Sequence, residues 1–172
     1  MPLPEGATSA ELLRSLGHHR SEYISFLISF AVIGGRWRAH HRLFHFVTTV
    51  RGGLLRLTFG WLLMMVLMPF ATKVLAEDGG FEFRFVLYAL VQVIALALFL
   101  MMTRQIQRHR LHCADIPPEL FGEVYRGLGT MIAAFAVSIP VAFVTQWAYA
   151  CWIVIPLAGN LLFRLRRPAA RA

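Results

Sequence analysis

A run of nineteen residues without a charge, from Phe85 to Thr103, is the feature that most restricts what this chain can fold into. A helix rises about 1.5 Å per residue, so about 20 apolar residues cross the hydrocarbon layer of a bilayer, which is about 30 Å thick. In that layer only helices and closed barrels pair all of their backbone N–H and C=O groups. The run therefore predicts a transmembrane α-helix over residues 85–103.

A second apolar run extends from Leu57 to Thr72. It is shorter, but Arg56 and Lys73 at its ends can hold their charges at the membrane surface while their hydrocarbon stems lie in the apolar layer. We therefore expect a further span over about residues 54–76.

The C-terminal part of the chain has no charged residue between Gly127 and Phe163. This length is nearly double that of one span, and Pro140 and Pro156 lie within it. Two helices over about 127–146 and 148–165, joined by a short turn, fit this stretch better than one very long helix.

The first apolar segment is ambiguous, because the uncharged run from Tyr23 to Gly35 has only thirteen residues. A run of this length fits a buried or interfacial helix as well as a span. We expect the helix to continue through the basic stretch that follows. The chain is then an all-α integral membrane helical bundle with five transmembrane helices, at about 23–50, 54–76, 85–103, 127–146 and 148–165. They form a single domain over 23–167, between tails at 1–22 and 168–172.

The composition agrees with a chain that lies in a lipid bilayer. It is 58% hydrophobic and 15% charged, against about 45–50% and about 25% in soluble domains. Seventeen Lys and Arg against nine Asp and Glu give a net charge of +8, which in a soluble protein would suggest nucleic acid. Here the basic residues separate apolar runs, so we expect the bilayer as partner and no nucleic acid.

The basic residues also predict an orientation. The first and third connections and the C-terminus are rich in Arg, whereas the second connection, from Lys73 to Arg84, contains Glu77, Asp78 and Glu82. Because basic connections stay in the cytoplasm, this alternation predicts a multi-pass protein with its N-terminus outside and its C-terminus inside.

Aromatic and histidine side chains form one stripe on the first helix, where Trp37, His40, His41, Phe44 and His45 have helical offsets of 0, 3, 4, 7 and 8. Three interpretations are open. The stripe could anchor the helix at the membrane surface, form a buried hydrogen-bond network, or bind a metal. The third lacks support nearby, because no acid or Cys completes a ligand set.

A second cluster contains His109, His112 and Cys113, which would share one helical face. Such a face could hold zinc or copper, but the flanking arginines favour a basic helix end at the inner membrane surface. We therefore expect no metal and no cofactor, with this cluster as the weak candidate.

The chain carries few signs of an enzyme. The sequence HHRLFH invites comparison with membrane desaturases and hydroxylases, which hold paired metals with several His-rich boxes, but only one such box occurs here. Nucleophile, phosphate-binding and dinucleotide motifs do not occur either. We therefore expect no enzymatic activity.

The segment YISFLISFAVIGGRWRAHHRLFHF resembles the second helix of the transmembrane protein 175 family of potassium channels. The matching positions are Tyr23, Ser29, Phe30, Ile33, Trp37, His40, His41, Leu43 and Phe44. The segment MPFATKVLAE is similar to the end of the family's third helix, through Pro69, Phe70, Thr72, Leu75 and Glu77. Weaker likenesses, in YAL at 88–90 and SIP at 138–140, extend the resemblance to about residues 10–167.

The resemblance implies a six-helix unit that assembles as a tetramer in bacterial members, with potassium as the transported ion. It also implies that Trp37, His40 and His41 belong to a network that meets the first helix, which lines the pore and carries an FSD motif. This chain has no FSD, and nothing before Tyr23 is long or apolar enough to be that helix. We therefore expect either a reading frame that begins late or a five-helix relative that cannot line a pore by itself.

Two functions follow as expectations. The first is a potassium-selective channel in a bacterial plasma membrane, acting as a homo-oligomer and incomplete or non-conducting without the pore-lining helix. The second is an accessory or structural membrane protein without transport activity. A metal-dependent membrane enzyme is a distant third.

Overall fold

In the computed structural model, residues 20–166 are described, and within them the fold is all-helical, as predicted. The helices are α2 (Arg20–Phe44), α3 (Gly52–Ala76), α4 (Phe81–Arg108), α5 (Pro118–Ala142), the short 3₁₀ helix η1 (Gln146–Ala150) and α6 (Cys151–Arg166). The described residues contain no strand beyond an isolated bridge between Val47 and His112.

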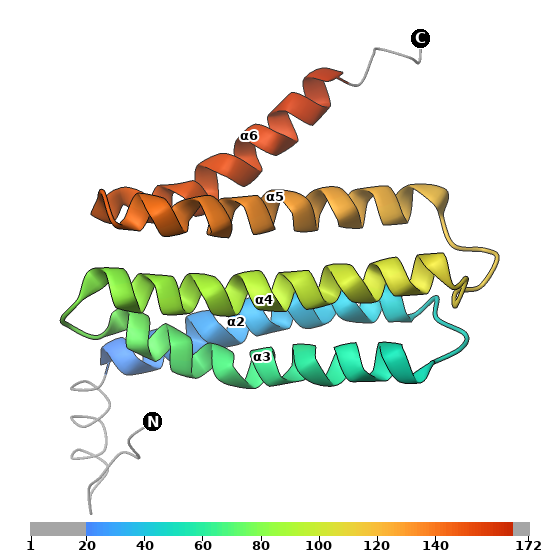
Figure 1. Cartoon of the computed structure of the whole chain (residues 1–172), viewed down its shortest axis with the longest axis horizontal. Helices are drawn as coiled ribbons and strands as arrows, with labels where there is room; N and C mark the ends of the chain where they lie inside the picture. Colours follow the sequence, from blue (N-terminus) through green and yellow to red (C-terminus); the bar gives the residue numbers. More distant parts are fainter. Residues whose placement is uncertain (1–19, 167–172) are drawn as a thin grey trace, which may run out of the picture.

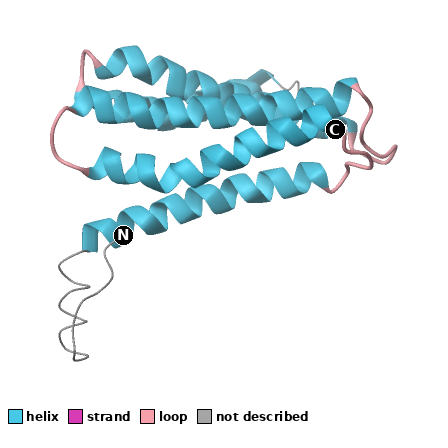
Figure 2. Ribbon diagram, turned by 60° about the horizontal axis from the view of Figure 1, so that its bottom comes forward, coloured by secondary structure: helices cyan, strands magenta, loops and turns pink. Residues whose placement is uncertain are grey.

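The helices α2 to α5 run alongside one another in alternating directions, and α6 leaves the bundle at an angle (Figure 1). α4 is central, because it packs against α3 on one side and against α5 on the other. α2 packs against α3, and α6 packs against α5. The loops gather at the two ends of the bundle (Figure 2).

The core of the bundle lies along α4. The side chains of Phe85, Ala89, Leu96, Met102 and Ile106 are all at most 1% exposed. They lie on or close to the charge-free run that defined the clearest predicted span. In the most apolar 18-residue window of α4, 44% of residues are buried, against 6% in the window at Gln146–Phe163. The last helix therefore presents most of its apolar surface outward.

Within residues 20–166, four helical segments are long and apolar enough to cross a membrane. They are Gly52–Ala76, Phe81–Arg108, Glu119–Ala142 and Gln146–Phe163. α2 is long enough, with 25 residues, but Arg36, Arg38 and Arg42 lie inside it and lower its hydropathy. The bundle therefore has the five expected helices, of which four are apolar enough to span.

The observed helix ends differ from the expected ones where a polar stretch follows an apolar run. α2 ends at Phe44 and does not reach residue 50, whereas α4 continues from the apolar run to Arg108. α5 begins at Pro118, ahead of the expected start at 127. Charged residues marked the expected ends, but an amphipathic helix continues through charges that face water or headgroups. Arg104 and Arg108 consequently lie on α4.

The two connections at the Arg-rich end of the bundle are hydrogen-bonded to each other. The backbone N–H of Thr48 donates to the carbonyl of Leu111 at 2.8 Å, and that of Cys113 donates to the carbonyl of Phe46 at 2.9 Å. The α2–α3 connection and the α4–α5 connection are thus paired. At the opposite end Arg84 donates to the carbonyl oxygens of Leu75, at 3.1 Å, and Gly79, at 2.7 Å.

Candidate functional site

The most informative group of side chains lies where α2, α3 and α4 meet. Arg36, His40 and Phe44 are spaced by four residues along α2, so they lie one above the other on the same helical face. Trp37 lies three residues before His40 and extends this face. Because α2 stays helical from Arg20 to Phe44, the whole stripe is presented by one rigid element.

The first part of the site is a cluster of stacked rings, which we call the aromatic cluster: Trp37, His40 and Phe44 on α2, Trp61 on α3 and Phe99 on α4. The imidazole of His40 is at its centre. Its centroid lies 4.0 Å from that of Phe44, 4.7 Å from that of Trp61 and 6.1 Å from that of Phe99. The corresponding ring planes are inclined by 14°, 16° and 29°, so the rings are stacked. Each such pair contributes about 0.5–1.5 kcal/mol beyond its buried area.

The aromatic cluster has a buried and an open side. His40 is 8% exposed and Trp61 only 2%, whereas Trp37 is 54% exposed although its ring stacks on His40 at 5.7 Å. The Nε2 atom of His40 is buried and has no hydrogen-bond partner among the described residues. Leaving such an atom unpaired costs about 1–3 kcal/mol, a cost that the packing of the surrounding rings has to offset.

The second part of the site is a set of polar contacts that we call the polar bridge: Arg36, Met68, Tyr88 and Gln92. A guanidinium N–H of Arg36 donates to the side-chain oxygen of Gln92 at 3.0 Å. The amide nitrogen of Gln92 donates to the hydroxyl of Tyr88 at 2.8 Å and lies 3.2 Å from the sulfur of Met68. Gln92 is 1% exposed, so this bond between α2 and α4 lies inside the bundle.

The polar bridge is chemically unusual for a membrane bundle. An arginine at the depth of a spanning helix is costly, and it normally faces protein or water and marks a functional position. Here the neutral side chain of Gln92 holds the guanidinium of Arg36 through a hydrogen bond of the stronger, charge-assisted kind. The aromatic cluster and the polar bridge share α2, so together they fix its position against α3 and α4. The arrangement suits positioning of a helix better than covalent chemistry.

The structure brings some of the predicted site residues together and separates others. Trp37, His40 and Phe44 lie in the aromatic cluster, whereas the side chain of His41 is exposed. Ser29 is buried earlier on the same helix.

The residues that resemble the family's third helix lie toward the end of α3. Pro69 and Phe70 lie in the last third of α3, Thr72 donates to the carbonyl of Met68 at 2.9 Å, and Glu77 is the exposed residue that follows α3.

The weak metal candidates do not share a helical face, and that expectation was wrong. α4 ends at Arg108, and Arg110 has a φ of 50°, which turns the chain out of the helix. Nδ1 of His112 lies 2.8 Å from the backbone oxygen of the adjacent Cys113, while His109 is exposed beyond the helix end. Among residues 20–166, no three His, Cys, Asp or Glu side chains are grouped to hold a metal.

Several site residues could not be singled out from the sequence. Arg36 was counted with the basic connection, because an arginine near a helix end normally reaches the membrane surface. A signal was present, since Arg36 lies one turn before His40, and Tyr88 lies one turn before Gln92. Nothing in the sequence identifies Trp61 and Phe99 as site residues, because a large apolar residue on a spanning helix faces lipid as readily as protein.

Comparison with known proteins gives the site a family context. The family model described as "Endosomal/lysosomal potassium channel TMEM175" matches residues 1–69, which include α2 and most of α3. A protein named as a potassium channel from Streptomyces collinus is 32% identical over 100 residues, which cover 56% of this chain and 48% of that protein. Another from a Chryseobacterium species is 33% identical over 73 residues, covering 42% of this chain and 36% of that protein.

The matched part thus spans about half of the first relative's length and less of the second's. No solved structure matches the chain. The family model covers the helix that carries Arg36, Trp37 and His40. The chain is thus similar to two proteins named as potassium channels and, over its N-terminal part, to the TMEM175 family of potassium channels, and the four membrane-capable segments among its described residues are typical of a multi-pass membrane protein.

Proposed function

We propose that the chain is a subunit of a potassium channel that transports potassium selectively as a homo-oligomer, a tetramer as the resemblance implies. The observation that carries this proposal is the position of the family match. It covers the whole described α2 segment, including the α2 residues of the aromatic cluster and the polar bridge. The part of the chain that the family model matches therefore supplies the α2 side of both groups of contacts.

Within that function we propose that the network of Trp37, His40 and His41 meets the helix that lines the pore through the exposed Trp37 and His41, with His40 buried behind them. Trp37 is more than half exposed although it stacks on His40, so its outer face can contact a further helix. The apolar side chains of Leu27 and Phe30 on α2 are exposed as well. Such a surface needs lipid or another helix against it.

The arrangement of charged residues supports an orientation. The α2–α3 and α4–α5 connections lie at one end of the bundle, and the α3–α4 connection lies at the other (Figure 1). Arg51, Arg108 and Arg110 are at the first end, whereas Glu77 and Asp78 are at the second. We propose a bacterial plasma membrane with the Arg-rich end and the C-terminus in the cytoplasm.

We further propose that the 172 residues do not conduct by themselves. A selective pore needs a narrow constriction repeated around its axis. The resemblance assigns this constriction to an FSD-bearing helix, and the sequence FSD does not occur in the chain. If neither the chain nor a version extended by such a helix conducts, the alternative is an accessory membrane protein without transport activity.

Ion flux from proteoliposomes tests the proposal. The 172-residue chain and a version extended at its N-terminus by an FSD-bearing apolar helix are reconstituted separately, and potassium and sodium efflux are compared with protein-free liposomes. We expect potassium-selective flux from the extended version alone, and cross-linking of the same vesicles should give species up to a tetramer. Flux from the short chain would show that other helices line a pore. No flux from either version would favour the accessory function.

A further inference from the structure

A cavity of about 640 Å³ lies at the Arg-rich end of the bundle, beside the last turns of α4. Its walls come from three helices. Leu57 belongs to α3, Tyr125 belongs to α5, and the remaining lining residues belong to the end of α4 and the residue after it. It does not overlap the aromatic cluster or the polar bridge, because none of their residues lines it.

The cavity changes from apolar to basic along α4. Leu57 and Met101 line the part nearer the middle of the bundle, and Arg104, Arg108 and His109 line the part nearer the end. The lining includes no carboxylate. Arg104 and Arg108 are four residues apart on one helical face, where two like charges repel each other unless an anion lies between them. The cavity therefore combines an apolar groove with an unneutralised pair of guanidinium groups.

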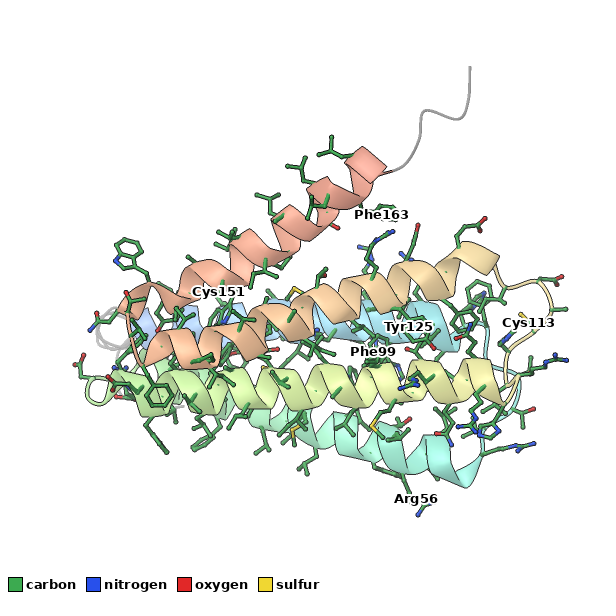
Figure 3. All side chains as sticks on the ribbon, turned by 45° about the horizontal axis from the view of Figure 1, so that its top comes forward. Arg56, Phe99, Cys113, Tyr125, Cys151 and Phe163 are labelled. Carbon is green, nitrogen blue, oxygen red and sulfur yellow. The ribbon has the colours of Figure 1, made fainter. Side chains whose placement is uncertain are left out.

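Neighbouring contacts keep the walls in place. The hydroxyl of Tyr125 donates to the side-chain oxygen of Gln107 at 2.8 Å, which ties α5 to the end of α4 (Figure 3 shows Tyr125 between these two helices). Glu123 on α5 forms its ion pair with Arg42 at 3.8 Å, and neither residue lines this cavity. This carboxylate is thus engaged elsewhere.

We propose that this cavity binds an anionic phospholipid, with its phosphate between Arg104 and Arg108 and an acyl chain against Leu57 and Met101. Basic pockets between spanning helices at the cytoplasmic membrane surface suit such headgroups. The charge-assisted bonds that guanidinium groups make to phosphate oxygens are strong and directional. A lipid is favoured over a free phosphate ion because the groove continues onto apolar surface, where Met101 is 52% exposed.

Lipid binding to the purified full chain tests the proposal. Native mass spectrometry from dodecyl maltoside measures titration with palmitoyl-oleoyl phosphatidylglycerol and, separately, with the matching phosphatidylcholine. We expect the unaltered chain to bind phosphatidylglycerol preferentially. Each basic group near an anionic headgroup contributes about fivefold in affinity, so Arg104→Gln together with Arg108→Gln should weaken binding about 30-fold.

The matched control removes two arginines from the same end of the bundle that do not line the cavity, Arg51→Gln with Arg56→Gln. Arg56 points away from the bundle in Figure 3. This control should change affinity by less than about twofold, because in a micelle no charged bilayer surface attracts the protein. Equal losses in both double variants, or no preference for phosphatidylglycerol, would overturn the proposal.

Two further experiments distinguish a bound lipid from a bound free anion, and one of them uses a variant that keeps both arginines. Met101→Trp fills the apolar groove and keeps both arginines, so it should also weaken phosphatidylglycerol binding. Inorganic phosphate at millimolar concentration should not displace the lipid. Unchanged lipid binding by Met101→Trp, or saturable displacement by phosphate, would refute a lipid site.

Discussion

The polar bridge allows a sharp test of what holds α2 in place. In Gln92→Leu the guanidinium of Arg36 loses the acceptor at 3.0 Å, and the hydroxyl of Tyr88 loses its donor at 2.8 Å. A hydrogen bond to a charged group contributes about 1.5–3 kcal/mol, so we expect the free energy of unfolding to fall by about this amount. Leu has nearly the volume of Gln, so packing changes little.

A double variant shows how much of the loss comes from the missing hydrogen bond and how much from the unpaired charge of Arg36. Arg36→Met combined with Gln92→Leu replaces both polar groups by apolar ones, which is close to neutral when the shapes fit. The double variant should therefore be more stable than Gln92→Leu alone, with a coupling energy of about 1.5–3 kcal/mol. Equilibrium unfolding in mixed detergent and dodecyl sulfate micelles measures the unaltered chain, the single variants Gln92→Leu and Arg36→Met, and the double variant. Gln107→Leu is the matched control, because this exposed glutamine lies on the same helix and bonds only a neutral hydroxyl.

The reasoning would be refuted by a coupling energy below about 0.5 kcal/mol, a value typical of independent sites. It would also be refuted if the Gln107→Leu control lost as much stability as Gln92→Leu. Either result would mean that apolar packing alone fixes α2 against α4.

Two further predictions follow from the structure. Trp61→Ala should lower the free energy of unfolding by about 3–5 kcal/mol, whereas Trp37→Ala should cost less than half as much, because Trp37 is 54% exposed. Equal costs when the 172-residue chain unfolds in detergent would contradict this difference in burial. In a background without the native cysteines, membrane-impermeant labelling of intact cells should reach Asp78→Cys but not Arg166→Cys. Labelling of both from outside would reverse the proposed position of the C-terminus.

The helical architecture could be predicted from the sequence because charge-free runs determine which segments can lie in lipid. The helix ends could not, because Arg104 and Arg108 continue α4 where the apolar run stops. Charge marks the edge of the hydrocarbon layer, whereas backbone hydrogen bonds determine the end of a helix. At Arg110 the chain leaves the helix with a φ of 50°, which no feature of the hydropathy pattern indicated.

Of the candidate site, only the residues on α2 could be predicted from the sequence. Helical spacing placed Trp37, His40 and Phe44 on a common face of α2, and the structure agrees. Periodicity describes one helix at a time, so it could not identify Trp61 or Phe99 as the rings that stack on His40. Such partners depend on how the helices are rotated and shifted against each other, which the sequence of each helix does not specify alone.

The paired connections at the Arg-rich end have a mechanical consequence. The backbone bonds of Thr48 to Leu111 and of Cys113 to Phe46 join the α2–α3 hairpin to the α4–α5 hairpin. Each such bond contributes about 0.5–1.5 kcal/mol, so drawing the two hairpins apart at this end requires breaking both. The α3–α4 connection joins the same two hairpins covalently at the end that carries Glu77 and Asp78. The hairpins are therefore linked at both ends of the bundle, by hydrogen bonds at the Arg-rich end and by the chain itself at the other.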